Sequence, residues 1–204
     1  MCGRFQLKIS TSLLARIFNA VSTVENFETR GEIFPSNDSP VLINDPQQAD
    51  SRRLGLMKWG FQFSGSKKLI INARSETIAE KPLFKDSFQQ RRCLIPAQAF
   101  YEWSGPSGNK IKHQIRVENE EIFALAGLYK KFDFENEDSW RFTIITTEAN
   151  EEIAEIHDRM PVIITKDDIS SWLDPNSEMA RLKRLLKPFA GKLNIIPPPP
   201  AKLF

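Results

Sequence analysis

The chain has 204 residues, of which 41% are hydrophobic and 26% charged, and its formal net charge is +2. These values are typical of a globular protein with a sizeable core, and 15 Phe and 4 Trp exclude disorder over most of the chain. No run of about 18 apolar residues predicts a membrane span, and no signal-peptide core is present, so we expect a cytoplasmic protein. The two Cys exclude a disulfide framework, and no CxxC or HExxH spacing predicts a metal site.

The positive charge is concentrated in one segment. Residues 51–112 contain 12 Lys and Arg but 4 Asp and Glu. A basic segment within a nearly neutral protein is consistent with a binding surface for a polyanion such as nucleic acid. The alternative is a solvated surface whose charges are balanced in space by the more acidic second half of the chain.

The first half of the chain is predicted to contain one helix and several short strands. The strands are expected at residues 2–7, 41–43 and 69–72. The helix is expected at 10–21, capped by Ser10 or Thr11. Its apolar residues fall on one helical face: Leu13, Leu14, Ile17, Phe18 and Val21. Residues 22–52 are otherwise expected to be irregular, because Pro35, Pro40 and Pro46 interrupt them.

The second half is predicted to be rich in strands. These are expected at residues 93–102, 111–117, 122–129, 140–147 and 162–165. Helices are expected at 150–157, at 165–173 behind a capping box at Thr165–Asp168, and at 177–187, and Pro197–Pro200 predicts a rigid extended tail. Because the βαβ alternation of a parallel sheet is missing, we predict an α+β fold with an antiparallel or mixed sheet, in a single domain over residues 1–204.

Cys2 directly follows the initiator Met. Removal of Met1 would leave an amine and a thiol on one residue, with reference pKa values of about 8 and about 8.5. An N-terminal aminothiol condenses with an aldehyde to an imine, and its thiolate then closes a thiazolidine ring. We expect the neighbouring ammonium to favour the thiolate. The alternative is a small, partly buried Cys at the start of an edge strand.

Three other residues are candidates for reactive groups. Asn72 ends an apolar run, although such an Asn is often a turn former. Glu102 is a lone carboxylate among aromatic residues, where loss of water would raise its pKa and suit it to proton transfer, unless strand alternation directs it outward. His157 has the side chain best suited to proton transfer near neutral pH, or it is a helix-end His that contacts terminal carbonyl groups.

Four short blocks occur in order along the chain. They are Met1–Phe5 (MCGRF), Ile71–Thr77 (INARSET), Arg92–Ala97 running into Phe100–Trp103, and His157–Pro161. Together they resemble the SRAP family, named for "SOS response-associated peptidase". The resemblance is clearest over residues 1–175, and it implies a partly barrel-like mixed sheet with flanking helices.

The resemblance implies a function in DNA damage. Members of this family sense abasic sites, mostly in single-stranded DNA, and form a covalent DNA–protein crosslink. The positions that match their reactive residues are Cys2, Asn72, Glu102 and His157. The resemblance also implies DNA carrying an abasic site as the partner, a location at the nucleoid when DNA is bound, and an associated peptidase activity. We further expect no cofactor, no membrane association and a monomer.

Further residues match positions expected to contact DNA. Arg4, Arg74 and Arg159 are expected to bind phosphates beside the lesion, because binding without sequence preference depends on such contacts. Trp59 and Trp103 are candidates for stacking on bases or inserting between them. Packing in the core is the alternative for both Trp residues.

The chain departs from the family in three segments. In residues 30–35, Glu32 replaces an Asn expected to face DNA. In residues 61–66 a Pro-x-Trp pattern is missing, and Phe61 or Phe63 is the candidate substitute for the Trp. The closing segment of the family is not recognisable in residues 193–204. DNA affinity and structural preference are therefore expected to differ from those of typical relatives.

Two other functions are compatible with the residues alone. One is an N-terminal-nucleophile amidohydrolase or peptidase in which the Cys2 thiol attacks an amide. The other is a non-catalytic nucleic-acid-binding module, whose function would survive Cys2→Ala but not the loss of Arg4 or Arg74. The amidohydrolase alternative does not explain the segments around Glu102 and His157.

Overall fold

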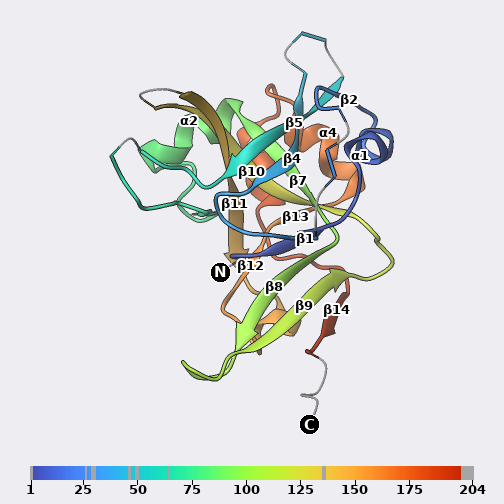
Figure 1. The fold of residues 1–204 in the computed structure, drawn as a ribbon, viewed down its shortest axis with the longest axis vertical. Helices are drawn as coiled ribbons and strands as arrows, with labels where there is room; N and C mark the ends of the chain where they lie inside the picture. Colours follow the sequence, from blue (N-terminus) through green and yellow to red (C-terminus); the bar gives the residue numbers. More distant parts are fainter. Residues whose placement is uncertain are drawn as a thin grey trace.

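The structure is a computed structural model (Figure 1). It describes residues 2–25, 27–28, 31–45, 47–48, 51–63, 65–134 and 137–198. The predictions for Met1, Arg30, Pro46 and the end of the tail at 199–204 lie outside these residues. None of the helices in the described part of the chain has the length and apolar character needed to span a lipid bilayer.

Five strands close into a barrel. In their order around it they are β4 (Asp38–Asn44), β5 (Arg52–Trp59), β11 (Glu137–Glu148), β10 (Phe123–Phe134) and β7 (Arg92–Ala97). The neighbours pair antiparallel except β5 and β11, which pair in parallel and complete the ring. A Cβ at Gly127 would lie 2.4 Å from Ile95 Cδ1 and 2.9 Å from the Thr143 carbonyl oxygen, so glycine is needed for this close approach. The predicted α+β, partly barrel-like architecture is confirmed.

A second, wholly antiparallel sheet lies beside the barrel (Figure 1). Its order is β14 (Leu193–Ile196), β9 (Ile111–Val117), β8 (Ala99–Ser104), β1 (Phe5–Leu7) and β3 (Gly31–Ile33). The chain passes from the barrel into this sheet at Gln98, whose side-chain oxygen accepts a 2.7 Å hydrogen bond from the Lys8 backbone N–H. The single strand predicted at 93–102 is therefore wrong, because β7 and β8 belong to different sheets.

The remaining elements are short. Four strands extend the barrel sheet: β2 (Ala20–Ser22), β6 (Asn72–Arg74), β12 (Arg159–Pro161) and β13 (Ile163–Ile164). The helices are α1 (Thr11–Ile17), α2 (Pro82–Gln90), α3 (Glu151–Ala154), α4 (Ile169–Leu173) and α5 (Met179–Leu185), with a 3-10 turn at Lys166–Asp168. The Thr165 hydroxyl bonds the Asp168 carboxylate at 2.9 Å, not a backbone N–H, so the predicted capping box does not form.

The first helix is shorter than predicted. It ends at Ile17, because Asn19 adopts a left-handed conformation (φ 47°) and the chain continues as β2. Leu14 and Phe18 are buried, but Leu13 and Ile17 are 43% and 47% exposed. The predicted apolar face was therefore too wide.

Candidate active site

Four segments that are distant in sequence bring the predicted reactive residues together. Cys2 precedes β1, Asn72 begins β6, Glu102 lies in β8, and His157 lies between α3 and β12. The Asn72 amide Nδ2 donates a 3.1 Å hydrogen bond to the Cys2 carbonyl oxygen. Cys2 and Glu102 are close enough for the carboxylate to influence the thiol. The site thus lies where the barrel sheet meets the second sheet.

Cys2 is fully buried, and its thiol lies 3.9 Å from the Arg4 carbonyl oxygen. Burial raises the thiol pKa well above its ordinary value, and the charge of Glu102 raises it further. The positive charge of the chain terminus acts in the opposite direction but is weaker. The expected thiolate is therefore not favoured with Met1 in place, and the thiol is protonated at neutral pH.

Glu102 is buried, with 1% of its surface exposed. Burial raises its pKa to about 7, the positive chain terminus lowers it, and Asp158 raises it slightly. This confirms the predicted desolvated carboxylate and excludes the alternative of an outward-facing one. A group with a pKa near neutrality can both accept and donate a proton under physiological conditions.

One polar atom of the Asn72 side chain forms a hydrogen bond, and the other has no partner among the described residues. Its Nδ2 holds the Cys2 carbonyl, as described above, whereas its Oδ1 is buried and has no hydrogen-bond partner among the described residues. A buried carbonyl oxygen without a donor is costly, which marks a place for a donor that arrives with a ligand or a processed chain terminus. Asn72 begins a strand, so it is not the turn former of the alternative interpretation.

His157 follows the end of α3, and 27% of its side chain is exposed. Its Nδ1 lies 3.0 Å from the Arg159 backbone nitrogen and 2.7 Å from Asp158 Oδ1, two contacts that require opposite protonation of Nδ1. The backbone N–H is fixed while the Asp158 side chain is 84% exposed, so the tautomer with its proton on Nε2 fits better. Burial and the positive chain terminus lower the His157 pKa below 6.5, so the ring is mostly neutral at pH 7.

The three Arg residues predicted to bind DNA have different surroundings. Arg74 is exposed, and its side chain has no hydrogen bond or ion pair with any described residue. Arg159 has a 12% exposed side chain that forms two bonds to Glu76, at 2.5 and 2.9 Å, and one to the Thr146 carbonyl oxygen at 2.7 Å. Arg4 is paired with Glu32 at 3.0 Å. Of the three, Arg74 is therefore best placed to meet a phosphate.

The prediction that Trp59 stacks on DNA is wrong. Its side chain is fully buried in the barrel, its Nε1 donates to the Ile71 carbonyl oxygen at 3.0 Å, and its ring stacks on Phe142. Trp103 is partly exposed and lies 5.1 Å from the Arg4 guanidinium, so it remains a candidate. Between the two candidate substitutes, Phe61 is fully buried, whereas Phe63 is 49% exposed.

A groove of about 580 Å³ begins beside Asn72. Its lining includes the cations Lys68, Arg74 and Lys81 and the exposed ring of Phe63, and it contains no acidic residue. Lys68 and Lys81 were not singled out from the sequence, although both lie in the basic segment 51–112. A polar cavity of about 600 Å³ between β5 and α4–α5 contains none of the four reactive residues. In the described part of the chain, no group of three His, Cys, Asp or Glu is arranged to hold a metal ion.

Several known proteins are similar to this chain in sequence or in fold. The family model for SOS response associated peptidase (SRAP) matches residues 1–198. "Abasic site processing protein YoqW" of Bacillus subtilis (strain 168) is 38% identical over 203 residues, covering 93% of this chain and 88% of the relative. "Abasic site processing protein HMCES" of Xenopus tropicalis is 32% identical, covering 69% and 52%. A crystal structure of a Bacteroides thetaiotaomicron protein superposes with a TM-score of 0.85 at 25% identity, covering 96% and 91%. The chain therefore belongs to the SRAP family.

Proposed function

We propose that this protein senses abasic sites, mostly in single-stranded DNA, and captures them through Cys2 after Met1 has been removed. The observation that carries the proposal is the buried Glu102, with a pKa of about 7, beside the Cys2 thiol and the positive chain terminus. A proton-transfer group next to a terminal aminothiol suits condensation with an aldehyde. The names of the relatives, which are abasic site processing proteins, support the same substrate.

The proposed reaction has two bond-forming stages. The Cys2 amine attacks the aldehyde carbon of the ring-opened deoxyribose, and loss of one water gives an imine. The Cys2 sulfur then adds to the imine carbon while the thiol proton passes to nitrogen, which closes a thiazolidine ring. Ring closure removes the imine that would otherwise promote β-elimination and cleavage of the DNA strand.

Each neighbouring residue has a role in this sequence. Glu102 accepts a proton from the attacking amine and returns it to the departing hydroxyl. His157, with its proton on Nε2, donates to the sugar oxygen during ring opening. The unpartnered Asn72 Oδ1 accepts a hydrogen bond from the Cys2 amine or from the sugar. The amine reacts first and the sulfur second, because the sulfur closes the ring by adding to the imine carbon that the amine has formed.

The DNA strand is proposed to follow the groove beside Asn72. Lys68, Arg74 and Lys81 would contact phosphates, and Phe63 would stack on a base. These contacts carry no sequence information, which suits a protein that must find a lesion in any sequence context.

The experiment is an incubation with a single-stranded oligonucleotide that carries one abasic site, followed by a denaturing gel. The wild type is expected to give an adduct that survives without reduction. Cys2→Ala keeps a terminal amine but no thiol, so its adduct is expected to survive only when borohydride reduces the imine. An equally stable adduct from Cys2→Ala without borohydride would contradict the proposal, as would no adduct from the wild type.

The family description also names a peptidase. Attack on an amide by Cys2 would require a thiolate, and burial together with Glu102 opposes one. A non-catalytic binding module would explain the basic groove but not the buried carboxylate. Hydrolysis of amide substrates by a protein that forms no DNA adduct would favour the peptidase alternative.

A further inference from the structure

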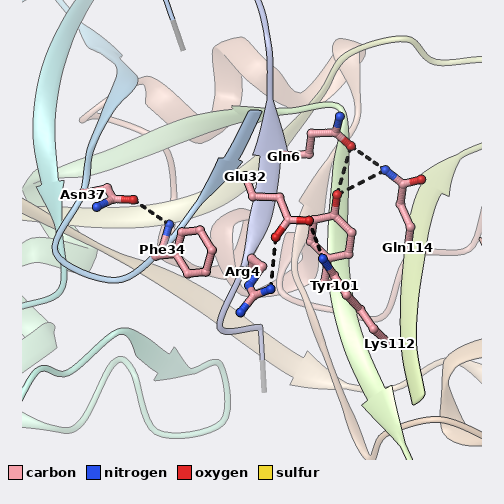
Figure 2. Close-up of polar contacts among 8 residues, drawn as sticks. All are labelled: Arg4, Gln6, Glu32, Phe34, Asn37, Tyr101, Lys112 and Gln114. Atoms are coloured by element: carbon pink, nitrogen blue, oxygen red, sulfur yellow. Dashed lines mark hydrogen bonds and ion pairs between the residues drawn. The ribbon is translucent and has the colours of Figure 1, made fainter. Parts of the chain in front are cut away.

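One carboxylate joins two cations at the edge of the second sheet. Glu32 in β3 forms an ion pair with Arg4 at 3.0 Å and a second, shorter one with Lys112 in β9 (Figure 2). We name these three residues the Glu32 cluster. The side chains of Arg4, Glu32 and Lys112 are 28%, 32% and 31% exposed, so all three lie at the same partly solvated surface.

The cluster is held in place by its surroundings. The Arg4 guanidinium lies over the rings of Phe34 and Trp103, at 4.3 and 5.1 Å from their centres. Lys112 lies 4.0 Å from the centre of the Tyr101 ring. The Tyr101 hydroxyl donates to Gln6 at 3.1 Å and accepts from Gln114 at 3.3 Å (Figure 2). Both cations therefore contact aromatic rings as well as the Glu32 carboxylate.

The cluster also lies close to the reactive residue. Arg4 is two positions from Cys2, and its carbonyl oxygen accepts from the Cys2 thiol and, at 3.0 Å, from the Tyr101 backbone N–H. The Arg4 guanidinium has five N–H donors, and its ion pair with Glu32 uses Nη1. A phosphate of a DNA strand bound at Cys2 would therefore meet a cation that already has an anionic partner.

Glu32 remains charged at neutral pH. Burial alone would raise its pKa, but the hydrogen bond and charge of Lys112, and then Arg4, outweigh burial and hold the pKa below its ordinary value. Arg4 and Lys112 thus share the one negative charge of Glu32. The cluster carries a net charge of +1, whereas the two cations without Glu32 would carry +2. A DNA phosphate gains less from a cation whose charge is partly neutralised.

We propose that Glu32 is a specificity-determining residue that acts as an internal competitor for a DNA phosphate. It weakens non-covalent binding to intact single strands, so that retention depends on covalent capture at Cys2. This inference rests on the proposed function, because it requires DNA at the same surface. A residue that merely oriented Arg4 for phosphate binding would have the opposite effect when it is replaced.

The test compares the binding of an undamaged, fluorescein-labelled single-stranded oligonucleotide by wild type and Glu32→Gln. Loss of the competing charge is expected to tighten binding about threefold or more near 0.1 M salt, and to steepen the slope of log K against log salt by about 0.7, the value of one additional phosphate contact. Glu121→Gln, which removes an exposed acid outside the cluster, is the matched control and should change affinity less than twofold. Replacement of both Arg4 and Lys112 by Gln in the Glu32→Gln variant should abolish the gain.

Unchanged or weaker binding by Glu32→Gln would overturn the inference. Thermal denaturation of each variant checks that the fold is intact, and Glu32→Ala repeats the measurement should the Gln variant not fold. The adduct formed by the wild type with an abasic oligonucleotide is scored separately. If that adduct fails to form, the proposed function is wrong, whereas the affinity ratio on intact strands still decides the role of Glu32.

Discussion

At the scale of single residues, the chemistry of the site depends on burial. Glu102 is buried, and removal from water moves its pKa to about 7. The same effect raises the pKa of the Cys2 thiol in the chain that retains Met1. In the proposed function, these two groups act as a proton-transfer group and as the nucleophile of the second stage.

The raised pKa of Glu102 predicts a pH-dependent stability difference. Between its ordinary value of 4.5 and about 7 the folded state holds a proton that the unfolded state has lost, so wild-type stability falls as pH rises through this window. Glu102→Gln removes the ionisation and is expected to gain about 2–3 kcal/mol relative to wild type between pH 4.5 and 8. Urea unfolding of both proteins across this pH range measures the difference in their free energy of unfolding. The titration of His157 is common to both proteins and is expected to cancel in this difference. A constant difference would contradict the raised pKa.

Alanine variants of Phe61 and Phe63 distinguish a role in core packing from a role in DNA binding. Phe63→Ala should weaken binding to single-stranded DNA by about 1–3 kcal/mol, because an exposed ring is lost from the groove. It should lower the free energy of unfolding by only about 1 kcal/mol, through the loss of its edge-on contact with Phe132. Phe61→Ala should instead cost about 3–5 kcal/mol of stability, since its ring is fully buried. The two measurements are fluorescence anisotropy and thermal unfolding. Equal effects of both variants on binding would exclude a stacking role for Phe63.

The surroundings of the candidate reactive residues were easier to predict from the sequence than those of the candidate DNA-contacting residues. Cys2, Asn72 and Glu102 occupy one site, and the environment expected for Glu102 is confirmed. Trp59 was misassigned because one sequence does not reveal that its ring lies inside a closed barrel. The contacts of Arg159 with Glu76 could not be predicted from the sequence either, because the two residues are 83 positions apart.

At the scale of elements, one buried cation joins two helices to the barrel. Arg92 in β7 is 3% exposed, and its guanidinium donates to the Phe88 and Gln89 carbonyls at the end of α2. It also donates to the carbonyls of Trp172 and Asp174 at the end of α4. Helix ends leave carbonyl groups without partners, and a single planar side chain satisfies four of them here.

Arg92→Lys is therefore expected to be strongly destabilising. The Lys ammonium has three donors and cannot reproduce the planar arrangement of the guanidinium N–H groups. Carbonyl groups that Arg92 holds therefore lose their partners, which lowers the free energy of unfolding by about 2–4 kcal/mol. Arg91→Lys, at the neighbouring position, makes none of these bonds and should change stability by less than about 1 kcal/mol. Urea denaturation followed by circular dichroism gives both values. A similar, small loss for the two variants would show that Arg92 does not hold the helices.

Several elements escaped sequence analysis for identifiable reasons. The signals of α2 were present, with Pro82 in its first turn and buried Phe84 and Phe88 four residues apart, but no helix was predicted there. The strand β14 pairs only with β9, and its register partners lie about 80 residues away, so local pattern gives little indication of it. Long-range pairing, not propensity, determines such short edge strands.

At the scale of the whole molecule, the fold brings the chain terminus to the junction of a closed barrel and a second sheet. Closure depends on the parallel pairing of β5 with β11, which joins residues more than 80 positions apart. The order of the four family blocks implied a barrel-like sheet, whereas composition and periodicity indicated only an α+β protein. The arrangement places the Cys2 thiol beside a buried carboxylate, and Asn72, which bonds the Cys2 carbonyl, lines the basic groove.

The central claim is that Cys2 becomes a terminal aminothiol that captures an abasic aldehyde. Intact-mass analysis of the purified protein, alone and after incubation with a single-stranded oligonucleotide carrying one abasic site, tests it most directly. The account predicts a free chain that lacks Met1, and a heat-stable adduct whose mass is the sum of chain and DNA less one water. Cys2→Ala should give no such adduct without a reductant. A chain that retains Met1, or a processed chain that forms no adduct, would contradict the account.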